Sequence, residues 1–182
     1  MNSSVQRTAG YVVLMLVLAV SGRVEAAERE GGPTDRGIAT VQVGTDGAPD
    51  VERKLGASPC MVPSVTGDTV SYLYNAKDAK GHYFLRLEVN GRVDSITVSK
   101  DPPLAGVCYA PLAHTMSLRT EEGLELGATM EEVLRVYGKP MERFAVGSMA
   151  RFRYVAMLDR TYEWDLVFRD GRLVEWTVVS EE

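Results

Sequence analysis

Two segments of this chain show the same order of patterns, one in each half. YFLRLEV at Tyr83–Val89 and YEWDLVF at Tyr162–Phe168 both place apolar side chains at alternate positions, and they lie 79 residues apart. RVDSITV at Arg92–Val98 and RLVEWTV at Arg172–Val178 follow them, 80 residues apart. Alternation of this kind is typical of β-strands with one buried face. Because the turn absorbs the one-residue difference, the pattern predicts a duplicated unit.

A short helix is predicted ahead of the strands in each half. In the second half, Thr129 is followed three residues later by Glu132, which is the spacing of a capping box at a helix start. Apolar residues at helical spacing then continue until Gly138, a residue that commonly ends a helix. In the first half, Pro49 suits the first turn of a helix, and Gly56 marks its end.

These patterns together predict an α+β fold of two tandem repeats. Each repeat is expected to be a short helix packed on a small antiparallel sheet of three or four strands. The first repeat would cover 38–102, a connector 103–120, and the second repeat 121–182. Since a helix of about two and a half turns is too short to be stable alone, each must bury its apolar stripe on its sheet.

The turn of the second hairpin decides which side chains share a face. A three-residue loop, Arg169–Gly171, would set Trp164 opposite Trp176 and keep one apolar face. A two-residue Asp-Gly turn would instead place Asp165 opposite Trp176. We prefer the first register, and we expect both tryptophans in the core rather than on an exposed aromatic surface.

The first residues are typical of a secretory signal peptide. A positive charge precedes the apolar run Tyr11–Val20, and small residues fit cleavage after Ala26 or, alternatively, Ala27. The run is too short to cross a bilayer core about 30 Å thick. We therefore expect a signal peptide over 1–26, a disordered polar leader over 27–37, and a protein that is periplasmic or secreted, with no stable membrane insertion.

The two cysteines, Cys60 and Cys108, predict a disulfide, because an even pair usually forms one in an oxidising compartment. Two buried thiols are the alternative. Loss of residues 1–26 removes two arginines and one glutamate and takes the net charge from −5 to −6. A negative domain argues against nucleic acid and against anionic membrane surfaces as partners.

Residues suited to catalysis or metal binding are sparse. His82 and His114 are the only histidines, and neither has a Ser, Cys or Asp at a spacing that would organise a triad. Asp165, Asp170 and Glu175 are too dispersed for a metal cluster. The sequence therefore predicts no enzyme, no cofactor and no metal.

The strand face away from the helices mixes charged and apolar side chains, and Val93 and Leu173 are expected to lie on it. Such a mixture suits a protein interface with a polar rim. A solvated face with cross-strand ion pairs is the alternative. The candidate partner-binding residues on this face are Arg86, Glu88, Arg151, Arg153, Asp165 and Glu175.

The second half also resembles a known group of proteins. Its short extended start at Gly123–Gly127, its capped helix, its Gly-x-Pro stop at Gly138–Pro140 and its F-x-D-G hairpin at Phe168–Gly171 resemble the SmpA/OmlA family of outer-membrane assembly lipoproteins and the beta-lactamase-inhibitor-like proteins. The inhibitor-like proteins are similar in having two such units in tandem, with sheets that form a concave binding surface. The assembly lipoproteins usually carry one unit and a lipidated cysteine, for which no candidate lies near the expected cleavage site.

The resemblance implies a non-enzymatic module that binds another envelope or secreted protein through a sheet face, as an inhibitor or an assembly accessory. The matching residues are scaffold residues and imply no binding site by themselves. A small secreted hydrolase or ligand carrier, with a pocket between the repeats, is the alternative function.

Overall fold

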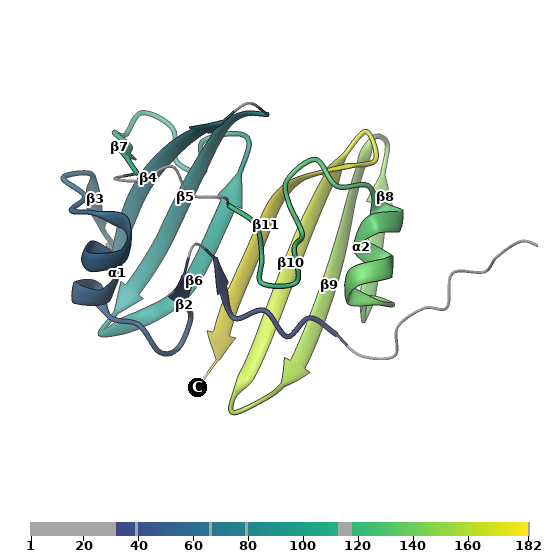
Figure 1. The fold of residues 1–182 in the computed structure, drawn as a ribbon, viewed down its shortest axis with the longest axis horizontal. Coiled ribbons are helices and arrows are strands. Elements are labelled where there is room, and N and C mark those ends of the chain that lie inside the picture. The colour runs from purple at the N-terminus through teal and green to yellow at the C-terminus, as the bar shows by residue number, and fades with distance from the viewer. Residues whose placement is uncertain (1–31, 39, 66, 79, 113–117, 182) are drawn as a thin grey trace, which may run out of the picture.

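A computed structural model describes residues 32–38, 40–65, 67–78, 80–112 and 118–181. One large sheet of nine strands dominates it (Figure 1). In spatial order its strands are β3 (Met61–Pro63), β4 (Val70–Asp78), β5 (Gly81–Asn90), β6 (Arg92–Ser99), β11 (Arg172–Glu181), β10 (Thr161–Arg169), β9 (Met149–Met157) and β8 (Glu142–Val146), and β7 (Ala110–Pro111) pairs with β4. The remaining elements are β1 (Gly37–Ile38), β2 (Val41–Gln42), α1 (Ala48–Leu55) and α2 (Met130–Tyr137).

The predicted α+β fold of two separate repeats is wrong. Strand β6 of the first half pairs with β11 of the second, from Ser95 opposite Val179 to Ser99 opposite Glu175. The described residues therefore form a mostly β protein with one large sheet, in place of two small sheets with a helix each. In separate repeats β6 and β11 would both be edge strands with unpaired backbone groups. Alternation along a strand identifies its buried face but says nothing about which edges meet.

Both helices lie where the sequence predicts them, and each is eight residues long. In α2, the Thr129 hydroxyl accepts from the Glu132 N–H at 3.1 Å, and the Glu132 carboxylate accepts from the Thr129 N–H at 2.7 Å. This confirms the capping box. In α1, Pro49 lies in the first turn, as predicted. Within the described ranges, neither helix is long and apolar enough to span a membrane.

One face of the sheet is covered and forms the core. Helix α1 inserts Val51 and Leu55, and helix α2 inserts Val133 and Tyr137, into a single cluster with the buried side chains of the strands. Between the helices, residues 118–126 cross the same face, with Leu124 and Leu126 buried in that cluster (Figure 1). The core is thus continuous across both halves.

Each helix is held to the sheet by a tyrosine at a corresponding position. The Tyr74 hydroxyl on β4 donates to the Gly56 carbonyl at the end of α1, at 2.8 Å. The Tyr154 hydroxyl on β9 donates to the Gly138 carbonyl at the end of α2, at 3.0 Å. These bonds satisfy carbonyl groups that a helix end leaves without an intrahelical partner.

The β10–β11 turn has two residues, whereas the preferred prediction had three. Arg169 lies opposite Arg172, and Asp170 and Gly171 have φ values of 51° and 73°. Positive φ at both central positions is typical of a type I′ turn, for which Asp-Gly is a favoured sequence. The longer loop was preferred because it kept the apolar side chains on one face.

A β-bulge keeps that apolar face despite the shorter turn. The register shifts between Val167 and Phe168, so that Trp176 lies opposite Leu166 and Trp164 lies opposite Val178. An extra residue on one strand realigns the pairs beyond it. Both tryptophans are buried, as predicted. The prediction that they face each other directly is wrong.

The β5–β6 hairpin has a register shift at the corresponding place, between Glu88 and Val89. The two bulges place one apolar residue of each half on the covered face of the sheet instead of the opposite face. Val93 and Leu173, which were expected on the open face, are only 0% and 1% exposed and belong to the core. Strict alternation, which the prediction assumed, fails at these two residues.

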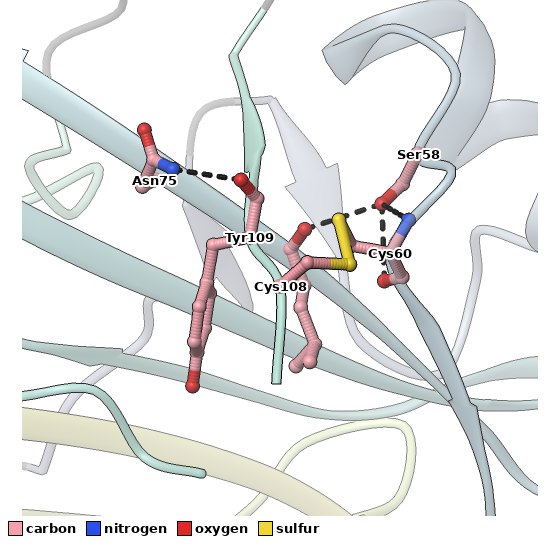
Figure 2. The surroundings of a disulfide bond; sticks show 6 residues. Ser58, Cys60, Asn75, Cys108 and Tyr109 are labelled. Carbon is pink, nitrogen blue, oxygen red and sulfur yellow. Dashed lines mark hydrogen bonds between the residues drawn. A yellow bond between two sulfur atoms is a disulfide. The ribbon is translucent and has the colours of Figure 1, made fainter. Parts of the chain in front are cut away.

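Cys60 and Cys108 form the predicted disulfide, with their Cα atoms 5.4 Å apart (Figure 2). The bond lies at the outer edge of β4. There the Leu73 N–H donates to the Cys60 carbonyl at 3.1 Å, and the Asn75 amide donates to the Tyr109 carbonyl at 2.8 Å (Figure 2). The disulfide therefore fixes the connector between the halves against this edge of the sheet.

Residues 32–37, the end of the leader predicted to be disordered, pack against the covered face. The Asp35 carboxylate accepts from the Tyr137 hydroxyl at 2.6 Å and from the Glu122 N–H at 2.7 Å. The Asp35 carbonyl accepts from the Trp164 indole N–H at 2.8 Å. Burial raises the pKa of the Asp35 carboxyl, and the hydrogen bonds oppose that rise. The predicted signal peptide lies outside the described residues.

Candidate functional site

All six predicted partner-binding residues lie on the face of the sheet away from the helices, which we call the open face. A row of residues crosses it from strand to strand. Arg86 lies opposite Thr97, and Thr97 opposite Thr177, whose hydroxyl is 3.1 Å from that of Thr97. Asp165 follows opposite Thr177, and Arg153 opposite Asp165. The open face therefore has charged groups on both sides of a neutral centre.

The charged side chains of the second half are paired with one another. The Arg151 guanidinium makes two hydrogen bonds to the Asp165 carboxylate, one of them from Nε to Oδ1 at 2.7 Å. Arg153 bonds Glu163 at 2.6 Å and lies 3.6 Å from Glu142. Such partly exposed pairs contribute little to stability. They do hold the two guanidinium groups in defined positions on the face.

Glu175 lies in the same group and is half-buried. Burial raises the pKa of its carboxyl, and the nearby Asp165 carboxylate adds to the rise, while Arg151 opposes it. The structure thus brings four predicted residues together on neighbouring strands. They are Arg151, Arg153, Asp165 and Glu175.

Arg86 and Glu88 form a separate group on β5. They are paired with each other, and the Ser95 hydroxyl donates to Glu88 at 3.0 Å. Three strand spacings, about 14 Å, separate Arg86 from Asp165.

The Tyr109 ring of the connector also packs on Phe84 of β5, with centroids 5.0 Å apart. The connector thus covers part of the open face in the first half.

Strand β8 borders the charged group of the second half, and the sequence reading missed it. All five of its residues are exposed, and among the described strands it pairs only with β9. The turn between the two strands is Gly147-Ser148, and Gly147 has a φ of 58°. Gly-Ser between two apolar-rich runs is a signal for a two-residue hairpin. This signal could have located β8.

Exposed apolar side chains gather along β8 and β9. Phe144 is 67% exposed and Val146 is 62% exposed. Among the described residues, seven of the ten exposed large apolar side chains lie between positions 141 and 158. They are Met141, Phe144, Val146, Met149, Val155, Met157 and Leu158. Of these, Phe144, Val146 and Met149 are neighbours beside the β8–β9 turn, where Val146 lies opposite Met149. Clustered exposed apolar surface commonly marks an interaction site.

A hollow of about 290 Å³ lies where the charged and apolar groups meet. It is lined by Glu142, Phe144, Arg151 and Arg153. A phenyl ring beside two guanidinium groups offers both apolar contact and hydrogen-bond donors. Aromatic and arginine side chains of this kind are enriched where protein interfaces gain most of their binding energy.

A second cavity, of about 430 Å³, lies between the two halves. Its charged lining consists of the cations Lys80, Lys100, Arg135 and Arg172 and the carboxylates Glu125 and Glu132. Arg172 donates to the Gly127 carbonyl at 3.2 Å, and a Cβ at Gly127 would lie 3.5 Å from the Lys100 amine. The cations outnumber the carboxylates, so the cavity favours an anion.

Side chains able to ligate a metal do not cluster in the described part of the chain. No three His, Cys, Asp or Glu side chains gather there to hold a metal ion. His82 is exposed, and His114 lies outside the described residues.

No family model, no curated protein and no solved structure matches this chain. The resemblance to the SmpA/OmlA and beta-lactamase-inhibitor-like proteins therefore stays a prediction.

Proposed function

We propose that this chain is a secreted or periplasmic module that binds another protein through its open face, without turnover. The binding region would be the second half of that face, on strands β8 to β11. The observation that carries the proposal is the uncovered apolar surface of Phe144 and Val146 beside the fixed pair of Arg151 and Asp165. Polar groups around an apolar centre are the usual anatomy of a protein interface.

The ion pairs alone would suit a merely solvated face. Arg151 and Arg153 both have carboxylate partners, and partly exposed pairs of this kind are common on protein surfaces. The apolar side chains favour an interface, because a solvated strand gains nothing from an exposed phenyl ring. A hollow beside Phe144 adds a place for a partner side chain.

The proposed location rests on two features. An apolar run at Tyr11–Val20 with a small-residue cleavage pattern is typical of a signal peptide. The Cys60–Cys108 disulfide is characteristic of an oxidising compartment. A protein exported in this way would meet envelope or secreted partners.

A charge swap on the open face tests the proposal. The double variant Arg151→Asp/Asp165→Arg keeps an ion pair at the same place but reverses its direction. We expect it to lose capture of a stoichiometric partner that the wild type recovers from envelope extract, because an interface is complementary in charge. We expect its Tm to stay within about 4 °C of the wild-type value, since exposed pairs contribute under about 1 kcal/mol.

The matched control is the same swap at another exposed pair, Arg36 and Asp159, whose charged atoms are 3.0 Å apart. Arg36 lies near the ring of Tyr162, a side chain of the covered face. This variant should keep partner capture. Equal capture by both variants, or no stoichiometric partner for the wild type, would contradict the proposal.

A ligand carrier is a second candidate, favoured by the cationic cavity of about 430 Å³. The probes are citrate and pyrophosphate, titrated calorimetrically into the intact protein. If the cavity binds anions, Lys100→Ala with Arg135→Ala should weaken binding at least tenfold, since both cations line it. Lys139→Ala, which changes an exposed cation outside that lining, should leave it unchanged. Absence of binding heat for the wild type would rule this candidate out.

A further inference from the structure

We propose that β8 pairs with the β8 of a second copy of this chain, antiparallel, about a two-fold axis at Phe144. The sheet would then continue across the dimer. The proposal goes beyond the binding function above and rests on the backbone, the side chains and the opposite edge of the sheet. Each of these gives an independent constraint on the partner.

The backbone of β8 offers unpaired groups at its outer edge. Val146 and Met149 flank the two-residue turn and form the closing pair of the hairpin. In an antiparallel hairpin the hydrogen-bonded pairs alternate along the strand. The N–H and C=O groups of Arg143 and Ala145 therefore point away from β9. An unpaired edge of this kind is a template for another strand.

A two-fold axis at Phe144 uses these groups fully. Arg143 of one copy would lie opposite Ala145 of the other, and by symmetry Ala145 of the first copy would lie opposite Arg143 of the second. Both residues carry outward backbone groups, so the two pairs can form four hydrogen bonds. The five residues Glu142–Val146 meet their own equivalents without overhang. A shift toward the N-terminus would bring Pro140, which lacks an N–H, into the pairing.

The side chains also fit this register. Phe144 would lie opposite Phe144 of the second copy, and facing aromatic residues stabilise antiparallel pairs. Glu142 would face Val146, and Arg143 would face Ala145. No two like charges stand opposite each other, which would destabilise the pair. The exposed apolar surface of Phe144 and Val146 would be partly covered.

The opposite edge of the sheet explains why the assembly would stop at two copies. The outer edge of β4 is already paired with β3 and β7. The sheet ends there in β3 and β7, which have three and two residues and each end in a proline, so β8 is the longer edge strand left for pairing. An interface formed by the same edge of both copies closes on itself. Two open edges per copy would instead allow an endless sheet.

Two substitutions at Ala145 test this register, because they should change the dimer dissociation constant in opposite directions. Ala145 is exposed and would face Arg143 of the second copy. Ala145→Glu should tighten the dimer, because it places a carboxylate opposite that guanidinium. Ala145→Lys should weaken it, because it places like charges opposite each other. We expect dimer dissociation constants about tenfold apart, measured by sedimentation equilibrium of the intact protein.

Three further variants keep the test decisive. Ala57, another exposed alanine, gives the matched controls Ala57→Glu and Ala57→Lys, which should leave the dissociation constant unchanged. Ala145→Pro removes one outward N–H per copy and should weaken the dimer at least tenfold while the hairpin bonds to β9 stay intact. A wild type that is monomeric up to millimolar concentration, or Ala145 variants that both shift in the same direction, would overturn the proposal.

Discussion

The two edges of the sheet differ sharply, although the parts beside them are alike. At one edge, β4 is covered by β3 and β7, and the Cys60–Cys108 disulfide fixes this cover in place. Both covering strands end in proline, Pro63 and Pro111. At the other edge, no strand of the described ranges lies outside β8, and all five of its residues are exposed.

Interior contacts do not explain this difference. Each half has an eight-residue helix, a tyrosine bond to the end of that helix, and a bulged hairpin at a corresponding place. Proteins commonly block edge strands with short strands, prolines and covering loops to prevent association. One edge of this sheet has such protection, and the other has exposed apolar side chains. The fold therefore hinders association at the β4 edge and not at β8.

The largest effect is expected at the closed edge. The double variant Cys60→Ser/Cys108→Ser removes a cross-link between residues 48 positions apart. We expect the free energy of unfolding to fall by about 4 kcal/mol in the chain-entropy account, measured by urea denaturation. Amide exchange at Leu73 should accelerate, since its N–H is bonded to Cys60. Faster exchange at β8 instead would contradict the view that the disulfide holds the β4 edge.

A large effect is also expected at Asp35, which holds α2 in the second half. Asp35→Ala leaves the Tyr137 hydroxyl and the Glu122 N–H without their buried acceptor. We expect the free energy of unfolding to fall by about 2–3 kcal/mol, measured by thermal and urea denaturation. A different aspartate contacts the helix of the first half, because Asp46 accepts from Lys54 of α1 at 2.7 Å, so the loss should appear first as faster exchange in α2. Equal acceleration in α1 would count against this difference between the halves.

The pH dependence of stability gives the same residue a second test. Because burial raises the pKa of the Asp35 carboxyl above 3.8 in the folded state, the folded protein holds this proton more tightly than the unfolded chain. Its contribution to stability is therefore greatest below pH 3.8 and is lost as pH rises through the folded-state pKa. The stability of wild type relative to Asp35→Asn should fall over that range. A difference in stability between wild type and Asp35→Asn that stays constant over this range would mean that the Asp35 carboxyl does not cause the pH dependence.

The smallest effect tests whether the interiors are alike. Tyr74→Phe and Tyr154→Phe each remove one hydroxyl that bonds the end of a helix. We expect each variant to lose about 1 kcal/mol of stability, by urea denaturation. Similar losses would support the view that the halves differ only at their edges. A loss confined to one variant would place the difference inside the halves as well.

Local features of the fold could be predicted from the sequence. The cap at Thr129, the glycine at the end of each helix and the alternation along β5 and β10 depend on neighbouring residues, and each is present. The pairing of β6 with β11 could not be predicted, because it depends on which edges meet in space. The two bulges that place Val93 and Leu173 in the core could not be predicted from strict alternation either.

The candidate site was predicted in part. Arg151, Arg153, Asp165 and Glu175 could be placed on one face by alternation, and they lie together. Arg86 shares that face but lies on β5, three strands away from Asp165 on β10. Alternation along a strand gives no distance between strands, so the sequence could not predict this separation. Strand β8 was missed because its apolar side chains are exposed, so no buried face marks it. Its Gly-Ser turn was the only local signal.

Amide hydrogen exchange at a series of protein concentrations compares the two edges directly. In dilute solution, the amides of Arg143 and Ala145 should exchange at rates close to those of unstructured peptides, while the Leu73 amide stays strongly protected. At high concentration, protection of Arg143 and Ala145 should rise and that of Leu73 should stay constant. Equal protection of all three amides in dilute solution, or no change at β8 with concentration, would contradict an open edge that pairs with a second copy.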